Sequence, residues 1–421
     1  MGAFVIRGCE IYLGGAFVPA ELEVRGGVVT ALGGGIVPGK GASVYNFKNC
    51  IVVPGLADVH VHLREPGFSY KETVASGTRA AARSGYAALC AMPNLSPVPE
   101  DAATLAQELD IIRRDAVIDV LPYGAITRGQ RGEQLADMAA MSPYVCGFSD
   151  DGRGVQSREL MRAAMLEAKR LGRPIAAHCE DNSLLRGGYI HDGEYAKAHG
   201  HRGICSESEW GPIARDIELL RETGCAYHVC HISTAESAAL IRSAKREGLD
   251  ITCETAPHYL LLSDSDLQED GRFKMNPPLR SERDRLALIE ALRDGTIDIL
   301  ATDHAPHSAE EKSRGLAGSA FGITGLETAF PLLWTGLVEP GIISRERLVE
   351  LMSTAPARRF GIESGIEPGG PATFAVFETE TTYRIDPERF ASKGRATPFA
   401  GREVRGRCVL NVVRGREVWR A

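Results

Sequence analysis

Short apolar segments alternate with helical stretches through the middle of this 421-residue chain, and this alternation constrains its fold more than any other feature. Eight segments are typical of buried strands, namely residues 56–63, 86–92, 118–125, 144–149, 174–178, 226–231, 250–255 and 297–302. Helical patterns fall between them, at residues 70–84, 103–114, 158–171, 207–222, 234–247 and 282–294. This order predicts an α/β fold, a right-handed parallel (β/α)8 barrel of the TIM type.

Both ends of the chain have a different pattern. Short alternating segments, including residues 4–6 and 10–13, are separated by glycine pairs in the first fifty residues, and similar segments end the chain. They predict antiparallel strands with tight turns. We expect the two ends to pair into one small β-sandwich, with residues 1–53 and 365–421 forming the sandwich and residues 54–364 the barrel.

Composition argues against several kinds of partner. The formal net charge of −7 and the lack of a Lys/Arg-rich run disfavour nucleic acid and anionic membrane surfaces. No apolar run approaches the length of a membrane span, and the N-terminal residues lack the layout of a signal peptide. The ten scattered cysteines include no Cys-x-x-Cys pair, which indicates reduced thiols in a cytoplasmic protein. We therefore expect any metal to be held by histidine and carboxylate.

The first predicted strand carries an unusual polar face. Its strict alternation places Asp58, His60, His62 and Arg64 on one side. Two histidines in this spacing project side by side and can hold one metal ion, and Arg64 can bind an anionic substrate. Two solvated histidines on an edge strand would give the same pattern, so this strand alone does not decide.

Polar residues also end four later strands: Asp150 and Asp151 follow residues 144–149, His178 and His231 end their own strands, and Asp303 follows residues 297–302. Barrel enzymes place their active sites at this end of the strands. Each residue alone could be a core histidine, a helix cap or a turn, but together they predict a metal centre. Imidazole and carboxylate ligands suit Zn²⁺, and the number of candidate ligands favours two ions over one. Such a centre activates water for hydrolysis.

Several runs, in order, closely resemble the motifs of the dihydroorotase family within the amidohydrolase superfamily. They are HVHLREPG (60–67), YKET (70–73), MPN (92–94), DDG (150–152), AHCED (177–181), HIST (231–234), MNPPLR (275–280), ATDHAPH (301–307) and FGITGLET (321–328). The resemblance covers about residues 45–365, extends to the flanking β-structure, and is strongest to the longer bacterial class I type.

The resemblance implies a ligand set. One metal is held by His60, His62 and Asp303, the other by His178 and His231, and an aspartate bridges the two. Spacing does not decide between the adjacent aspartates, but the family's Asp-Asp-Gly block points to Asp151 and leaves Asp150 structural. One or two Zn²⁺ ions per subunit are expected, with two favoured.

The resemblance also implies a substrate site. Arg64 offers a planar fork to the substrate carboxylate. The other residues expected to contact substrate are His62, Asn94, Asn276, His307, and the backbone of Phe321 and Gly322. Residues 307–325 are rich in glycine and charge, which favours a mobile loop that shields the site from water.

The implied activity is the reversible cyclisation of N-carbamoyl-L-aspartate to (S)-dihydroorotate in de novo pyrimidine synthesis, with Asp303 as the acid/base. One alternative is another cyclic amidohydrolase, an allantoinase or hydantoinase; Arg64 and the lack of a lysine in residues 144–154 count against it. A second alternative is a catalytically silent subunit that scaffolds aspartate carbamoyltransferase. Such a subunit would be expected to have lost metal ligands. We expect a homodimer, with aspartate carbamoyltransferase as the candidate protein partner.

Overall fold

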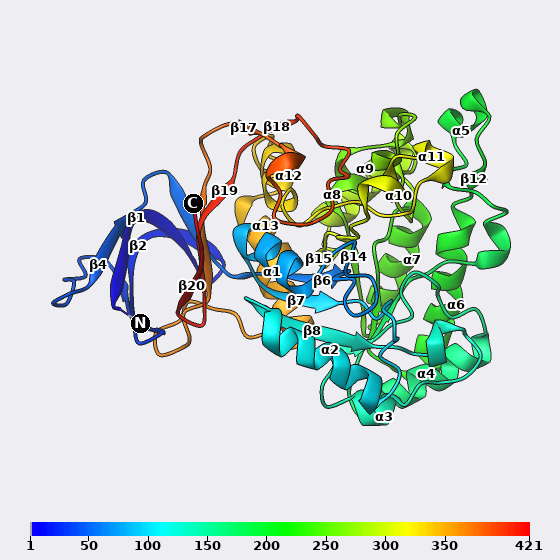
Figure 1. The fold of residues 1–421 in the computed structure, drawn as a ribbon, viewed down its shortest axis with the longest axis horizontal. Helices are drawn as coiled ribbons and strands as arrows, with labels where there is room; N and C mark the ends of the chain where they lie inside the picture. The colour runs from blue at the N-terminus through cyan, green and yellow to red at the C-terminus, as the bar shows by residue number, and fades with distance from the viewer. Residues whose placement is uncertain (1) are drawn as a thin grey trace.

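The computed structural model describes residues 2–421 and contains a barrel of eight parallel strands (Figure 1). The strands are hydrogen-bonded in the order β15-β14-β13-β10-β9-β8-β7-β6. They are β6 (Leu56–Val61), β7 (Tyr86–Ala91), β8 (Asp119–Gly124), β9 (Gly147–Phe148), β10 (Ile175–Ala177), β13 (Tyr227–Val229), β14 (Ile251–Thr255) and β15 (Ile299–Leu300). Each lies within one of the eight predicted segments, and the predicted fold class is confirmed.

The barrel closes where its first and last strands meet. Val61 forms a parallel bridge with His304, and the His62 N–H donates to the His304 carbonyl at 2.8 Å. The buried carboxylate of Asp58 spans the same junction, because it accepts from the Thr302 hydroxyl at 2.6 Å and from the His60 N–H at 3.0 Å. Burial raises the pKa of Asp58 to about 7. These contacts bring the ends of β6 and β15 together.

The longer helices between the strands are α1 (Val74–Arg83), α2 (Ala102–Asp115), α4 (Arg158–Leu171), α6 (Glu207–Thr223), α7 (Ala235–Arg246) and α9 (Glu282–Arg293). All six were predicted, but the predicted start of the first at residue 70 is wrong. Thr73 is its N-cap, and the Thr73 hydroxyl accepts from the Ser76 N–H at 3.0 Å. Residues 70–73 are therefore outside the helix, next to the barrel rim.

Shorter helices occupy the loops. They are α3 (Met138–Met141), α5 (Glu194–His199), α8 (Pro257–Leu261), α10 (Ala309–Lys312), α11 (Gly315–Gly318), α12 (Ala329–Leu333), α13 (Arg345–Val349) and α14 (Ala355–Phe360). Two small strand pairs, β11 (Ile190–His191) with β12 (Gly203–Ile204) and β17 (Tyr383–Arg384) with β18 (Glu403–Val404), complete them. Within residues 2–421, no helix is both long and apolar enough to cross a lipid bilayer.

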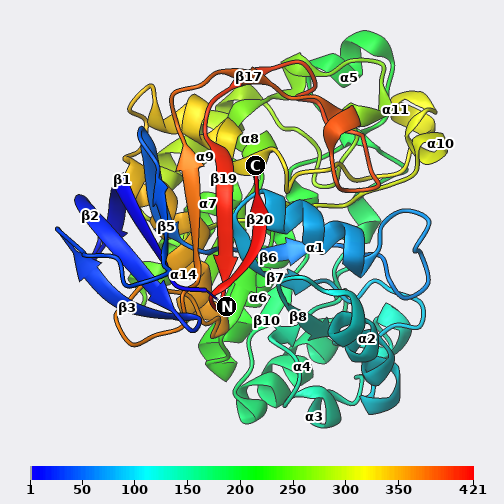
Figure 2. The ribbon, with the colours of Figure 1, turned by 60° about the vertical axis from the view of Figure 1, so that its left-hand side comes forward.

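Strands from the two ends of the chain form one further sheet beside the barrel (Figure 2). They are β1 (Phe4–Leu13), β2 (Ala16–Arg25), β3 (Val28–Gly33), β4 (Ser43–Asn46), β5 (Cys50–Pro54), β16 (Phe374–Glu378), β19 (Arg407–Val413) and β20 (Arg416–Arg420). The ends join where β16 pairs antiparallel with β5. The prediction of separate segments at 4–6 and 10–13 is wrong: β1 is one strand, bulged between Ile6 and Cys9, where Gly8 adopts a φ of 78°.

Candidate metal centre

Four histidines and two aspartates from the ends of five barrel strands meet at one point. We call these six residues the metal cluster; they are His60, His62, Asp151, His178, His231 and Asp303. Asp151 lies at their centre: its Oδ1 is 3.3 Å from His60 Nε2 and 3.5 Å from both His178 Nδ1 and His231 Nε2. Its other oxygen is 3.4 Å from His62 Nε2. One carboxylate therefore faces all four imidazoles.

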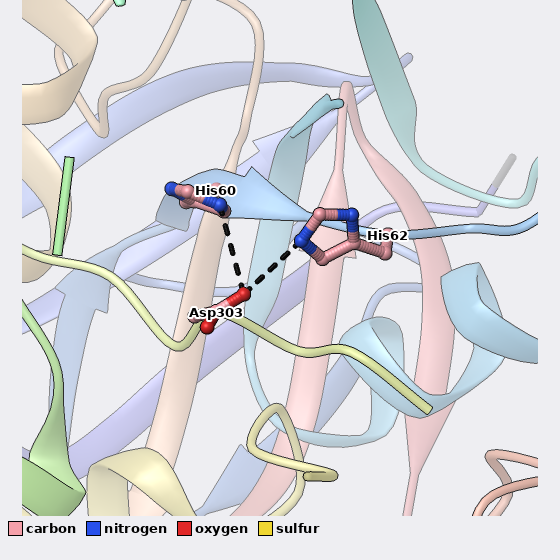
Figure 3. Close-up of side chains that lie close together, drawn as sticks. All are labelled: His60, His62 and Asp303. Carbon is pink, nitrogen blue, oxygen red and sulfur yellow. Dashed lines mark hydrogen bonds and ion pairs between the residues drawn. The ribbon is translucent and has the colours of Figure 1, made fainter. Parts of the chain in front are cut away.

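Asp303 completes one side of the cluster (Figure 3). Its Oδ1 lies 3.1 Å from His62 Nε2 and 3.6 Å from His60 Nε2. One ligand atom from each of these three residues falls within 4.8 Å of the others, and so does one from each of His60, Asp151 and His231. Both of these groups include His60, and all their members are buried.

Unused polar atoms show that the cluster suits a cation. His60 Nε2 and Asp151 Oδ1 are buried and have no hydrogen-bond partner among the described residues. Buried polar groups are normally hydrogen-bonded, so an orphaned imidazole nitrogen beside an orphaned carboxylate oxygen calls for another ligand. Both atoms point into the cluster, and imidazole nitrogen and carboxylate oxygen are typical metal donors. The buried His/Asp cluster can therefore bind metal.

Contacts at the Nδ1 atoms orient two of the imidazoles. His60 Nδ1 lies 2.6 Å from a carboxylate oxygen of Glu254, and His62 Nδ1 lies 2.9 Å from Asn94 Oδ1. Because both oxygens accept, each Nδ1 carries a proton and each Nε2 is left to face the cluster. Metal-ligating histidines are usually fixed by such a bond to a carboxylate or carbonyl.

The electrostatics of the cluster follow from its burial and mixed charge. Burial alone would lower the pKa of His60, but the carboxylates of Asp151 and Glu254 raise it well above its usual value. Burial would also lower the pKa of His178, but the carboxylates of Asp151 and Glu180 outweigh burial and raise this pKa to about 10. The same imidazoles hold the pKa of Asp151 well below its usual range against the effect of burial. The carboxylates therefore favour positive charge on these imidazoles, as they would favour a bound cation.

The two adjacent aspartates have different surroundings. Asp150 accepts from the backbone N–H groups of Ile126 and Thr127 at 2.8 and 3.1 Å, and from the Thr127 hydroxyl. It therefore ties the end of β9 to the loop after β8, while Asp151 faces the histidines. Sequence spacing did not separate the pair, but these contacts do.

Backbone strain gathers at the same rim. Arg64, His231 and Asp303 have positive φ values of 60°, 34° and 48°. Residues other than glycine rarely adopt this region, and where they do the strain is typical of functional sites.

Sequence reasoning missed two carboxylates that support the cluster. Glu254 is buried near the end of β14, where it contacts His60 and also lies 3.0 Å from His228 Nε2. Glu180 lies 3.5 Å from His178 Nε2 and accepts from the Asn276 amide at 2.8 Å. Glu254 could have been found, because it occupies the seventh strand at the same end as the predicted ligands. His228, which is not among the predicted ligands, thus contacts the same carboxylate as His60.

The predicted substrate residues line two sides of the cluster. Arg64 is buried beyond His62, and its Nε donates to the Pro306 carbonyl at 3.3 Å. One Arg64 nitrogen lies 3.3 Å from His307 Nε2. Asn94 contacts His62 of the metal cluster directly, whereas Asn276 contacts Glu180, which lies beside His178. The structure thus places Arg64, Asn94, Asn276 and His307 within one or two side chains of the cluster.

His307 holds the backbone that was predicted to bind substrate. Its Nε2 lies 2.7 Å from the Phe321 carbonyl, and a carbonyl only accepts, so this nitrogen carries the proton. Its Nδ1 then accepts from the Lys71 ammonium at 3.3 Å. Burial, with the charges of Arg64 and Lys71, lowers the pKa of His307 to about 3. His307 is therefore neutral near pH 7, with its one N–H donated to Phe321.

Several known proteins resemble this chain in sequence or in fold. The Dihydro-orotase-like family model matches residues 49–237. The dihydroorotases of Bacillus caldolyticus and Geobacillus kaustophilus are each 47% identical, over 100% of this chain and 99% of the relative. The L-hydantoinase (dihydropyrimidinase) of Arthrobacter aurescens has a TM-score of 0.88 at 25% identity, over 100% of this chain and 96% of that one. A dihydropyrimidinase from Brevibacillus agri, at 23% identity over 99% of this chain and 95% of that one with a TM-score of 0.86, shares the fold. On its full-length identity to these relatives, this chain belongs to the dihydroorotase family.

Proposed function

We propose that this protein is a dihydroorotase that interconverts N-carbamoyl-L-aspartate and (S)-dihydroorotate in pyrimidine biosynthesis. One observation carries the proposal: a buried arginine, Arg64, lies two residues beyond His62 in the segment that follows β6, next to two residues of the metal cluster. A hydrolytic centre that stands next to a buried guanidinium suits a small cyclic amide with a carboxylate.

We infer that the metal cluster would hold Zn²⁺, with two ions favoured over one. His60, His62 and Asp303 would hold one ion, His178 and His231 the other, and Asp151 would lie between them. Bound there, the metal would activate water near neutral pH and polarise the amide carbonyl, which is the chemistry that amide hydrolysis requires. The central position of Asp151, whose Oδ1 faces three imidazoles, supports the sharing of its carboxylate.

Asp303 would move the proton. In the hydrolytic direction, water oxygen bonds to the ring carbonyl carbon, the ring C–N bond breaks, and the proton from water passes through Asp303 to the departing nitrogen. Ring closure is the reverse. Asp303 suits this role because burial would raise its pKa, yet the neighbouring imidazoles of His62 and His60 keep that pKa below its usual value. The carboxylate is therefore ionised at neutral pH, the state in which a base must begin.

Arg64 would bind the substrate carboxylate, and Asn94, Asn276 and the backbone of residues 321–322 would hold the ring amides. His62 contacts Asn94 and would link the metal side to the substrate side. We further propose that the protein works in the cytoplasm as a homodimer. Light scattering during size-exclusion chromatography, with and without aspartate carbamoyltransferase, tests both the dimer and that partner.

The experiment that tests the activity is a substrate panel with the purified, metal-loaded chain. We expect steady-state hydrolysis of dihydroorotate and, in the reverse direction, cyclisation of N-carbamoyl-L-aspartate. Hydantoin, dihydrouracil and allantoin should be turned over little, because they lack the carboxylate that Arg64 would bind. Faster turnover of an uncharged ring would assign the protein to a hydantoinase-like activity instead. No turnover of any ring by a metal-loaded sample would indicate a silent subunit.

A further inference from the structure

Lys312, the last residue of α10, is buried and bound only by backbone. It is 7% exposed, and no carboxylate among residues 2–421 forms an ion pair with it. Its ammonium donates to three carbonyl groups, those of Lys274 at 2.9 Å, Ala320 at 2.8 Å and Gly322 at 2.7 Å. Lysine is seldom so buried, and the three N–H donors of an ammonium match three acceptors.

These carbonyls belong to the segments that carry the proposed substrate contacts. Gly322 is itself such a residue, and Lys274 lies two positions before Asn276. The Ala320 carbonyl is part of the peptide group that ends in the Phe321 N–H. Lys312 therefore fastens the end of the loop of residues 307–322, below called the substrate loop, to the segment before Asn276.

The backbone of Phe321 and Gly322 has one group left to offer. The Gly322 N–H donates to the Lys274 carbonyl at 3.1 Å, the Gly322 carbonyl accepts from Lys312, and the Phe321 carbonyl accepts from His307. The Phe321 N–H has no acceptor within the part of the chain that the structure describes. Of the four backbone groups, this one N–H is available to a ligand.

We infer that Lys312 is a positioning residue for substrate binding, which orients the Ala320–Phe321 peptide so that the Phe321 N–H can donate to the substrate. The inference rests on the proposed function. A positive charge at the carbonyl end of a peptide polarises it and strengthens its N–H as a donor. The loop cannot hold this geometry by itself, because α10 and α11 have four residues each and isolated helices of that length are unstable.

The protonation of Lys312 supports this reading. Burial, together with the nearby charge of Lys274, lowers the pKa of Lys312 to about 7, while Asp270 and Glu311 act in the opposite direction. A neutral amine has two N–H donors, so loss of the proton leaves one of the three carbonyls without a partner. Substrate binding should therefore weaken as the pH rises through neutrality.

The test compares Lys312→Met with Arg314→Met in the full-length, metal-loaded protein. Lys312→Met removes the donors and should raise the KM for dihydroorotate by about tenfold to a hundredfold, the loss expected for a hydrogen bond to a charged group. Its kcat should change much less, and its metal content should not change. Arg314 lies on the same loop, but its side chain pairs only with the exposed Glu310, so Arg314→Met should keep the wild-type KM.

The pH dependence separates positioning from a merely structural role. The wild-type KM should rise between about pH 6 and pH 9, the Lys312→Met KM should lose this rise, and Lys312→Arg should restore part of the binding. A wild-type KM in Lys312→Met, or equal loss in Arg314→Met, would overturn the inference. If Lys312→Met does not fold, a flat wild-type KM across this range would overturn it. Absence of turnover in the wild type would instead refute the proposed function.

Discussion

The metal cluster and the substrate loop face the same site but are held by different kinds of contact. The cluster residues end strands of the barrel, where sheet hydrogen bonds and buried carboxylates such as Asp58 and Glu254 fix them. The substrate loop has two four-residue helices, and its position depends on bonds from His307 and Lys312 to backbone carbonyls. Under the proposed function, the strand ends would carry the chemistry, and the loop contacts would help to recognise the substrate. Substitutions in the cluster should mainly affect kcat or metal, and those in the loop mainly KM.

The largest effect is expected from Asp303→Asn, which tests the chemical side of the comparison. The amide keeps an oxygen donor for metal but cannot shuttle a proton, and a positioned acid/base contributes about 10² to 10⁴ in rate. We expect kcat to fall at least about a hundredfold, with much of the metal retained and dihydroorotate still bound. Steady-state kinetics and metal analysis on one sample check this. A near-wild-type kcat would move the proton shuttle elsewhere, and Asp151 would be examined next.

Arg64→Met tests the recognition side. Leaving a substrate carboxylate without its buried partner should weaken binding by about 2–5 kcal/mol. The metal content should stay at the wild-type level, because Arg64 contacts His307 and the Pro306 carbonyl. Isothermal titration with dihydroorotate, alongside metal analysis, measures both. Loss of metal with intact substrate binding would contradict the division between the two regions.

The difference between the two regions also explains what the sequence could predict. The cluster was predictable because period-2 alternation identifies the strands and parallel strands bring their carboxyl ends to one rim, so His60, His178, His231 and Asp303 could be grouped from their positions alone. Asp150 and Asp151 could not be separated, because adjacent residues differ only in which way each side chain turns.

Long-range contacts between loops leave no periodic trace in the sequence. Residues 307–325 indicated a loop through glycine and charge, but not that Lys312 is buried against Lys274, which lies 38 residues away in sequence. The paired ends of the chain were predicted from their shared β-pattern. The single strand β1 was not, because the bulge at Gly8 breaks the alternation on which strand prediction depends.

Glu254→Gln sharpens the comparison by acting on the cluster from behind. It weakens the charge that holds His60 in place, and partners of this kind usually contribute about 10- to 100-fold in metal affinity or activity. We expect metal affinity to fall within that range and the KM of the metal-loaded enzyme to stay near wild type. Glu209→Gln is the matched control, because Glu209 is also buried but binds the hydroxyls of Ser233 and Thr234. Equal loss of metal affinity in both variants would mean that burial, and not orientation of His60, matters.

The smallest single step, about tenfold per pH unit, is expected from the effect of pH on metal loading. Ligand imidazoles must be neutral to bind metal, and in the metal-free cluster the pKa of His178 is raised to about 10. Below that pH the metal must displace a proton from the imidazole. The apparent metal affinity should therefore fall about tenfold for each unit by which the pH is lowered, for each displaced proton. Chelator competition between pH 6 and pH 8 measures this, and an affinity independent of pH would contradict the protonated state of the free cluster.

The most direct test of the account is turnover of dihydroorotate by one sample before chelation, after chelation, and after metal is restored. We predict that prolonged chelation abolishes turnover, that Zn²⁺ restores it, and that His178→Ala loses both metal and rate. Metal content must be measured on the same sample at each stage. Full activity in a verified metal-free sample would contradict the central claim that the buried histidine and aspartate cluster works through bound metal.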